Sequence, residues 1–157
     1  MIDILLDDDV EALVDKQDII KAATLSCLLA KEIKAPILCI RFSNNRVVQE
    51  LNATWRDKDQ VTDVLSFPMQ EAGEFEAEQS LGDIIIAAPF VSEEATRLTL
   101  PERAHCIHLV VHGTLHLLGF DHLNDAEAEV MQTLENKVMK QLGLHKPYPE
   151  LSDEVYL

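Results

Sequence analysis

The residues of this sequence best placed for chemistry are three histidines, His112, His116 and His122, whose spacing suits a shared metal ion. Four residues of α-helix advance by about 400°, so the imidazoles of His112 and His116 lie about 40° apart on one face and can share a metal ion. His122 cannot join them from a straight helix, because six more residues rise about 9 Å. Gly119 permits a left-handed break that folds His122 back. The sequence therefore predicts a metal site with three histidine ligands.

The predicted site has an open coordination position, which is typical of catalytic zinc, whereas structural zinc usually has four protein ligands. No cysteine lies near enough in the sequence to indicate a closed site. We therefore expect one Zn²⁺ per chain as the cofactor. Nickel, copper and cobalt stay open as alternatives, because three-histidine sites also accept them.

Two further histidines precede this motif on the same predicted helix. His108 stands four residues before His112, so His108, His112 and His116 form a rival ligand set. The ends of this set lie about 12 Å apart along the helix axis, which zinc–nitrogen bonds of about 2.0 to 2.1 Å do not span. We assign His108 to the surroundings of the ligands or to the core, and we expect His105 at the surface.

The histidine spacing also matches the zinc-peptidase pattern HExxHxxGxxH, in which the glutamate is the general base. The corresponding position here is Gly113, so that base is missing. Metal-activated water can attack without it, but peptide hydrolysis also needs a proton for the leaving amine. A metallopeptidase-like hydrolase is therefore kept as a weaker alternative.

Apolar patterning predicts the elements that position these histidines. Strands are expected at Ile2–Leu6, Pro36–Ser43, Val64–Phe67 and Gly82–Ala88. Helices are expected at about 16–34, 44–55, 89–98, 101–118 and 124–142. The first strand, helix and strand form a β-α-β unit, which favours a parallel pair. The expected fold class is α+β (an α/β layer protein), with one small mixed sheet of about four strands packed with five to six helices in one helical layer.

Length and charge limit the possible functions. The 157 residues fit a single domain, residues 1–157. Thirteen Lys and Arg against twenty-eight Asp and Glu give a net charge of −15, which argues against broad nucleic-acid binding because phosphates are attracted by clustered basic residues. A short basic strip beside a metal can still attract phosphate locally. The acidic stretch Met69–Ser80 is expected to be a mobile hairpin loop.

Cysteine usage and hydropathy indicate the compartment. Cys27, Cys39 and Cys106 are odd in number and have no CxxC spacing, so they predict no disulfide framework. The N-terminus lacks the basic start and apolar stretch of a secretory signal. The apolar runs, such as Ile84–Ala88, are far shorter than the roughly 20 residues of a membrane helix. We expect a cytoplasmic protein without a membrane partner.

Three blocks of the sequence resemble the YbeY family of rRNA maturation factors. They are HLVVHGTLHLLGFDH (His108–His122), NATWRDKDQVTDVLSFP (Asn52–Pro68) and LGDIIIAAP (Leu81–Pro89), in that family's order and spacing. The resemblance implies a metal-dependent endoribonuclease that prefers single strands and acts in ribosomal RNA processing, especially of small-subunit rRNA, and in ribosome quality control. The partners it implies are single-stranded RNA, ribosomal RNA and ribosomal small-subunit proteins, with no DNA expected.

The resemblance also assigns roles to residues. His112, His116 and His122 carry over as the zinc ligands, and Arg56 stands where the family has a functionally important arginine. Arg56 and His112 are therefore the expected catalytic residues. A guanidinium pairs with phosphate in two places, so Arg56 can hold the scissile phosphate and stabilise charge in the transition state. Phe120 stands where many members have tyrosine, which removes a hydroxyl but no metal ligand.

Several assignments stay open at this point. Asp121 either orients a zinc ligand or turns the chain. Asp63 and Ser66 either line the cleft or serve as a turn residue and a strand residue, and Lys58 is a weaker candidate for a neighbouring phosphate. The attacking group is either water or the RNA 2′-hydroxyl. A second function is a zinc-stabilised ribosome-assembly adaptor without essential nuclease activity, whose acidic face docks basic ribosomal proteins.

Overall fold

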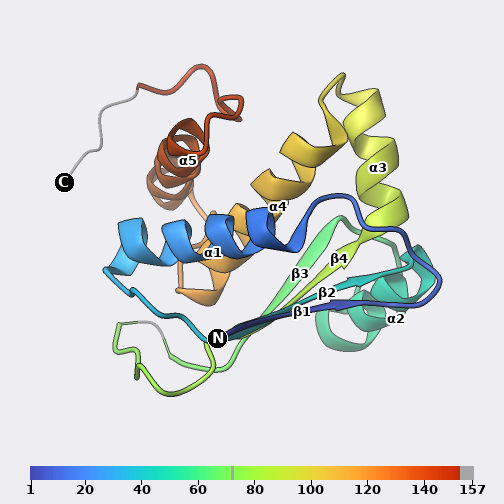
Figure 1. Ribbon diagram of the computed structural model, residues 1–157, viewed down its shortest axis with the longest axis horizontal. Coiled ribbons are helices and arrows are strands. Elements are labelled where there is room, and N and C mark those ends of the chain that lie inside the picture. Colours follow the sequence, from blue (N-terminus) through green and yellow to red (C-terminus); the bar gives the residue numbers. More distant parts are fainter. Residues whose placement is uncertain (72, 153–157) are drawn as a thin grey trace.

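A four-stranded mixed sheet forms the centre of the computed structural model, which describes residues 1–71 and 73–152 (Figure 1). Its strands are β1 (Ile2–Leu6), β2 (Leu38–Ser43), β3 (Val64–Pro68) and β4 (Gly82–Ala87), in the order β1-β2-β4-β3. β1, β2 and β4 are parallel, and β3 pairs antiparallel with β4. The predicted parallel pair at the start of the chain is confirmed, with helix α1 (Lys16–Lys31) as its connection.

Four further helices are present in the described residues. They are α2 (Asn45–Arg56), α3 (Ala88–Arg97), α4 (Glu102–Leu117) and α5 (Asp125–Gln141). Asn44 and Asn124 cap α2 and α5, because their side chains accept hydrogen bonds from backbone amides of the first turn. The α+β prediction, with one mixed sheet of about four strands and five to six helices, is confirmed, since the described residues form four strands and five helices. None of the helices described is long and apolar enough to cross a membrane.

The helices cover both faces of the sheet, so the prediction of a single helical layer is wrong. Alternate residues of β4 point to opposite faces. Ile84 and Ile86 pack in the large core with α1, α4 and α5, while Ile85 packs in a smaller cluster with Val48 of α2. Figure 1 shows α2 on the side of the sheet opposite α1 and α4. Because β4 is apolar on both faces, each face needs a helix to cover it.

α4 lies close against the sheet, and Gly113 makes this approach possible. A Cβ atom at position 113 would lie 3.1 Å from Cγ2 of Ile84, 3.2 Å from Oγ of Ser66 and 3.3 Å from Cγ2 of Val64. The Ser66 hydroxyl donates a hydrogen bond of 2.9 Å to the Gly113 carbonyl. This contact fixes the C-terminal half of α4 beside β3, which is one of the two edge strands of the sheet.

The segment from Met69 to Ser80 joins the antiparallel strands β3 and β4, so the predicted hairpin connection is present. The Gln70 side chain crosses it, accepting from the Glu76 amide at 2.8 Å and donating to the Gln79 carbonyl at 3.1 Å. Residue 72 lies outside the described residues. The mobility of this loop stays a prediction.

Candidate metal centre and cleft

The last two turns of α4 bring His112 and His116 together. Their ring centroids are 4.6 Å apart, and their Nε2 atoms are 3.1 Å apart. α4 then ends, and Gly119 adopts a φ of 95°, the left-handed conformation that the sequence predicted at this position. The chain reverses there and brings the ring of His122 to within 5.1 Å of the His116 ring, centroid to centroid.

The three histidines form a group whose geometry suits a metal ion. One ring nitrogen from each lies within 4.8 Å of those of the other two. Zinc–nitrogen bonds of about 2.0 to 2.1 Å at tetrahedral angles place two ligand nitrogens about 3.3 Å apart. The 3.1 Å between the Nε2 atoms of His112 and His116 is close to this value. The side chains present therefore fit a zinc ion, and the exposed position of His122 leaves one side of the group facing solvent.

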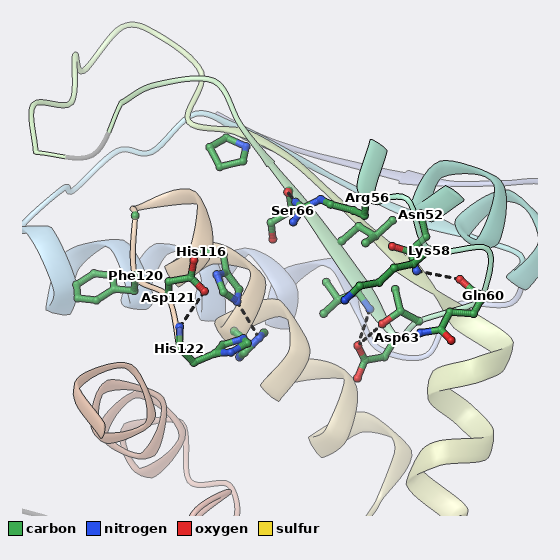
Figure 2. A pocket seen from close by; sticks show the side chains of 16 residues that line it. Asn52, Arg56, Lys58, Gln60, Asp63, Ser66, His116, Phe120, Asp121 and His122 are labelled. Atoms are coloured by element: carbon green, nitrogen blue, oxygen red, sulfur yellow. Dashed lines mark hydrogen bonds between the residues drawn. The ribbon is translucent and has the colours of Figure 1, made fainter. Parts of the chain in front are cut away.

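The histidine group forms one wall of a cleft of about 640 Å³ (Figure 2). The opposite wall comes from the end of α2 and from β3, and carries Arg56 and Lys58. Arg56 Nη2 donates a 2.6 Å hydrogen bond to the Ser66 carbonyl, and its guanidinium lies 5.8 Å from the centre of the Phe67 ring. Arg56 is thus anchored by one nitrogen in the cleft that the histidines line. A guanidinium has five N–H donors, so this bond engages only part of its donor capacity.

Asp63 and Ser66 each have both of the roles considered from the sequence. Both line the cleft. The Asp63 carboxylate accepts from the Val64 amide at 2.7 Å, as a turn residue does, and Ser66 bonds to α4. Asp121 accepts from the backbone amide of His122 at 2.8 Å. This contact belongs to a residue that turns the chain.

The carboxylate behind the metal group is Glu135 of α5. Its Oε1 lies 2.9 Å from Nδ1 of His112 and 2.8 Å from Nε2 of His108. Burial opposes ionisation of Glu135, but the hydrogen bonds from the two histidines and their charges outweigh it and lower its pKa to about 2. Burial likewise opposes protonation of His112, but the bond to Glu135 and its charge raise the pKa of His112 above the ordinary value.

The pKa of His116 is lowered, in contrast to that of His112. Burial disfavours its charged form, and His112 and His122 repel a third positive charge, so its pKa falls to about 4. A histidine that stays neutral at pH 7 keeps a lone pair available. This is the state that metal coordination requires.

His105 and His108, which precede the metal group on α4, are both held by carboxylates of neighbouring helices. The prediction that His105 lies at the surface is wrong, because its side chain is 6% exposed and its Nε2 lies 2.6 Å from Oε1 of Glu94. α3 packs over this part of α4 and supplies the carboxylate that makes burial tolerable. His108 lies among the surroundings of the ligands, as expected, with its Nε2 directed at Glu135 rather than at His112 and His116.

Sequence reasoning did not single out Glu135. A signal for it was present, since Glu135 stands four residues after Met131 and three before Val138, on the apolar face of the last helix. A glutamate at a core position is buried only with a partner. The partner, His112, belongs to a different helix, so the sequence pattern did not identify it.

Comparison with known proteins defines the class to which this fold and site belong. A sequence profile described as "Endoribonuclease YbeY" matches residues 6–143. A protein named Endoribonuclease YbeY from Zymomonas mobilis is 44% identical over 141 residues, covering 85% of this chain and 80% of its own. Its namesake from Azorhizobium caulinodans is 42% identical over 151 residues, covering 94% and 95%.

A solved structure agrees with the fold. The solution structure of a Thermotoga maritima protein superimposes with a TM-score of 0.56 at 24% identity, and the match covers 100% of both chains. The family profile spans most of the chain, and the two relatives exceed 40% identity over most of their length. The chain therefore belongs to the Endoribonuclease YbeY family, as the three sequence blocks indicated.

Proposed function

We propose that this chain is a zinc-dependent endoribonuclease that cleaves single-stranded RNA during maturation of small-subunit ribosomal RNA and in ribosome quality control. Membership of the Endoribonuclease YbeY family supports the reaction class. The observation that carries the proposal is the convergence of three histidines with Arg56 in one open cleft. A nuclease needs the components these side chains offer, namely a metal site with an open side and a cation for phosphate.

Each residue has a distinct role in this proposal. His112, His116 and His122 hold one zinc ion through ring nitrogens. When bound, zinc supplies Lewis acidity that polarises a phosphoryl oxygen or acidifies a water molecule. Arg56 pairs with the scissile phosphate and stabilises the charge that develops there. Its bond to the Ser66 carbonyl sets the direction of the guanidinium, so the fork is oriented before RNA enters.

The preference for unpaired RNA is supported by the shape and charge of the cleft. Its two basic residues, Arg56 and Lys58, share the lining with Asp63 and Asp121. Two cations can pair with adjacent phosphates of one strand, whereas a duplex needs contacts spread over a wider surface. The chain has a net charge of −15, which disfavours the remaining phosphates of a long duplex.

The proposal is tested with His116→Ala. Because His116 supplies one of the three nitrogens, the variant is expected to lose stoichiometric zinc and cleavage of a defined single-stranded RNA together. Metal analysis of the purified protein and gel analysis of the RNA measure the two outcomes. Full cleavage by this variant, in a preparation free of contaminating nucleases, contradicts the proposal. Product ends carrying a cyclic phosphate identify the 2′-hydroxyl as nucleophile, whereas 5′-phosphate and 3′-hydroxyl ends identify water.

An adaptor function has one observation in its favour. The net charge of −15 provides an acidic surface able to dock basic small-subunit ribosomal proteins. In that function zinc stabilises the fold and nuclease activity is dispensable. Cells whose only copy is Arg56→Ala distinguish the two, because an adaptor still supports ribosome maturation and a nuclease does not.

The metallopeptidase alternative is not favoured by the site. Position 113, where such peptidases have their glutamate, packs against Ile84 and Ser66 with no room for a long side chain. We place the activity in the cytoplasm. This is supported by Cys27, Cys39 and Cys106, which are all unpaired, as in a reducing compartment.

A further inference from the structure

Glu135 of α5 is buried directly behind the candidate ligand His112. Its side chain is 0% exposed. Oε1 receives hydrogen bonds from Nδ1 of His112 at 2.9 Å and Nε2 of His108 at 2.8 Å, and the Tyr148 hydroxyl lies 3.5 Å from the same oxygen. Burying a carboxylate is unfavourable unless it is paired. The two short contacts come from α4, so Glu135 ties α5 to the helix that carries the metal ligands.

The nitrogen of His112 that faces Glu135 is not the one that faces the other ligands. An ionised carboxylate only accepts hydrogen bonds, so the ring hydrogen of His112 lies on Nδ1 and the lone pair lies on Nε2. Nε2 is the atom 3.1 Å from Nε2 of His116. The bond to Glu135 therefore selects the tautomer that can bind a metal and holds the ring in that orientation.

The charge of Glu135 also complements a cation at this site. Three neutral imidazoles bring no negative charge to a divalent ion. Oε2 of Glu135 is buried and has no hydrogen-bond partner among the described residues. In the protein interior the attraction between a cation and a carboxylate is stronger than in water. A negative charge relayed through the imidazole also makes the ligand nitrogen more basic.

We propose that Glu135 is a positioning residue for the metal, which fixes the tautomer and orientation of His112 and thereby raises the zinc affinity of the three-histidine site. This inference rests on the metal centre of the proposed function. It gives α5 a role in the site, although none of the three candidate ligands lies on that helix.

Two substitutions separate orientation from charge. Glu135→Gln keeps the shape and an oxygen acceptor but removes the charge, and Glu135→Leu removes both. We expect the zinc dissociation constant of the full chain, measured by competition with a chromophoric chelator, to rise about 10-fold for Glu135→Gln and about 100-fold for Glu135→Leu. The unfolding midpoint of metal-free Glu135→Gln is expected to stay close to that of wild type, because the glutamine side-chain oxygen can still accept the hydrogen bonds from His112 and His108. A merely structural role predicts a lower midpoint.

Glu94 of α3 provides a matched control, because it also contacts a histidine of α4. Its Oε1 lies 2.6 Å from Nε2 of His105, so it is a second carboxylate bonded to a histidine of α4, with a side chain that is 15% exposed where that of Glu135 is 0% exposed. His105 is not among the three clustered histidines. Glu94→Gln is therefore expected to leave the zinc dissociation constant within about 2-fold of wild type, because the histidine that it bonds is not one of the three candidate ligands.

The outcomes distinguish this inference from the proposed function. Wild-type zinc affinity in a folded Glu135→Gln or Glu135→Leu protein overturns the inference alone. Equal weakening by Glu94→Gln also overturns it, because general loosening of α4 then explains the loss. A wild-type chain that takes up no zinc overturns the metal centre and this inference together. Circular dichroism establishes folding, and Glu135→Gln carries the test should the leucine variant not fold.

Discussion

Arg56 combines an exposed position with a fixed direction. Its hydrogen bond to the Ser66 carbonyl and its contact with the Phe67 ring hold the guanidinium in the cleft, so less side-chain freedom is lost when phosphate binds. Lysine at this position keeps the charge but has no planar fork. The residue type is therefore part of the proposed mechanism.

Substitution of Arg56 tests this reasoning. Arg56→Ala is expected to lower kcat/KM for a single-stranded RNA about 100-fold, the typical effect of removing one donor that stabilises transition-state charge. Arg56→Lys is expected to lie between the alanine variant and wild type. Zinc content is the control, since Arg56 is not among the clustered histidines. Unchanged kcat/KM in Arg56→Ala, or loss of zinc with it, contradicts the assigned role.

At the scale of elements, contacts with two neighbours determine the position of α4. It packs against β3 at Gly113, and Glu135 of α5 accepts hydrogen bonds from its histidines. The first contact explains why the peptidase-like spacing lacks a glutamate. The residue after His112 points at the sheet, where Ile84 and Ser66 already occupy the space that a side chain would need.

Gly113→Glu tests the packing of α4. The change creates the sequence of the peptidase pattern, but its carboxylate would be forced against the sheet. We expect the free energy of unfolding to fall by about 3 kcal/mol or more, from overpacking and from burial of an unpaired charge. Urea titration measures it. A variant as stable as wild type, or one that hydrolyses unstructured peptides, shows that the position faces the cleft instead.

The predictability of the elements follows from how local their signals are. The apolar periods predicted the strands and helices of the described residues within a few positions, because each period involves only residues that are near one another in the sequence. The arrangement of the helices on the two faces of the sheet was harder to predict. A helix on the second face of the sheet was not predicted, because the apolar residues of α2 indicate burial without indicating the partner.

In the candidate site, too, features that depend on local sequence were predicted and features that depend on tertiary packing were not. His112, His116 and Gly119 were found from spacing alone, since helix geometry and one left-handed residue determine how they meet. His105 was misplaced and Glu135 was missed. In both cases the deciding contact joins α4 to another helix, and such pairings depend on tertiary packing that a single sequence does not encode locally.

At the scale of the whole molecule, zinc is expected to stabilise the fold. A ligand present at about 100 times its dissociation constant adds about 2.7 kcal/mol to the free energy of unfolding. For a chain of this size, this corresponds to a rise in Tm of about 5 to 10 °C. Calorimetry with added zinc, and after removal of metal by a chelator, measures it. His116→Ala is expected to show no rise, and an equal rise in that variant places the stabilising zinc elsewhere.

The charge distribution predicts a shallow dependence of RNA binding on salt. Each phosphate neutralised on a single strand contributes about −0.7 to the slope of log K against log salt, so two cations, Arg56 and Lys58, give a slope of about −1.4. Binding isotherms of an uncleavable RNA between low and moderate salt determine the slope. A slope steeper than about −4 indicates a basic surface beyond the cleft, contrary to the prediction.

The three clustered imidazoles lie in one short stretch of chain, His112–His122, whereas Arg56 comes from a segment far from it in sequence and Glu135 from the next helix along the chain. Bringing together donors so close along the backbone loses little conformational entropy. The unfolded chain is therefore expected to bind zinc weakly as well, and this binding reduces the increase in the free energy of unfolding that zinc produces. In the proposed function, weak capture of the metal is thus a property of this short stretch, while tight binding and reactivity toward RNA require Glu135 and Arg56 to be brought beside it by folding.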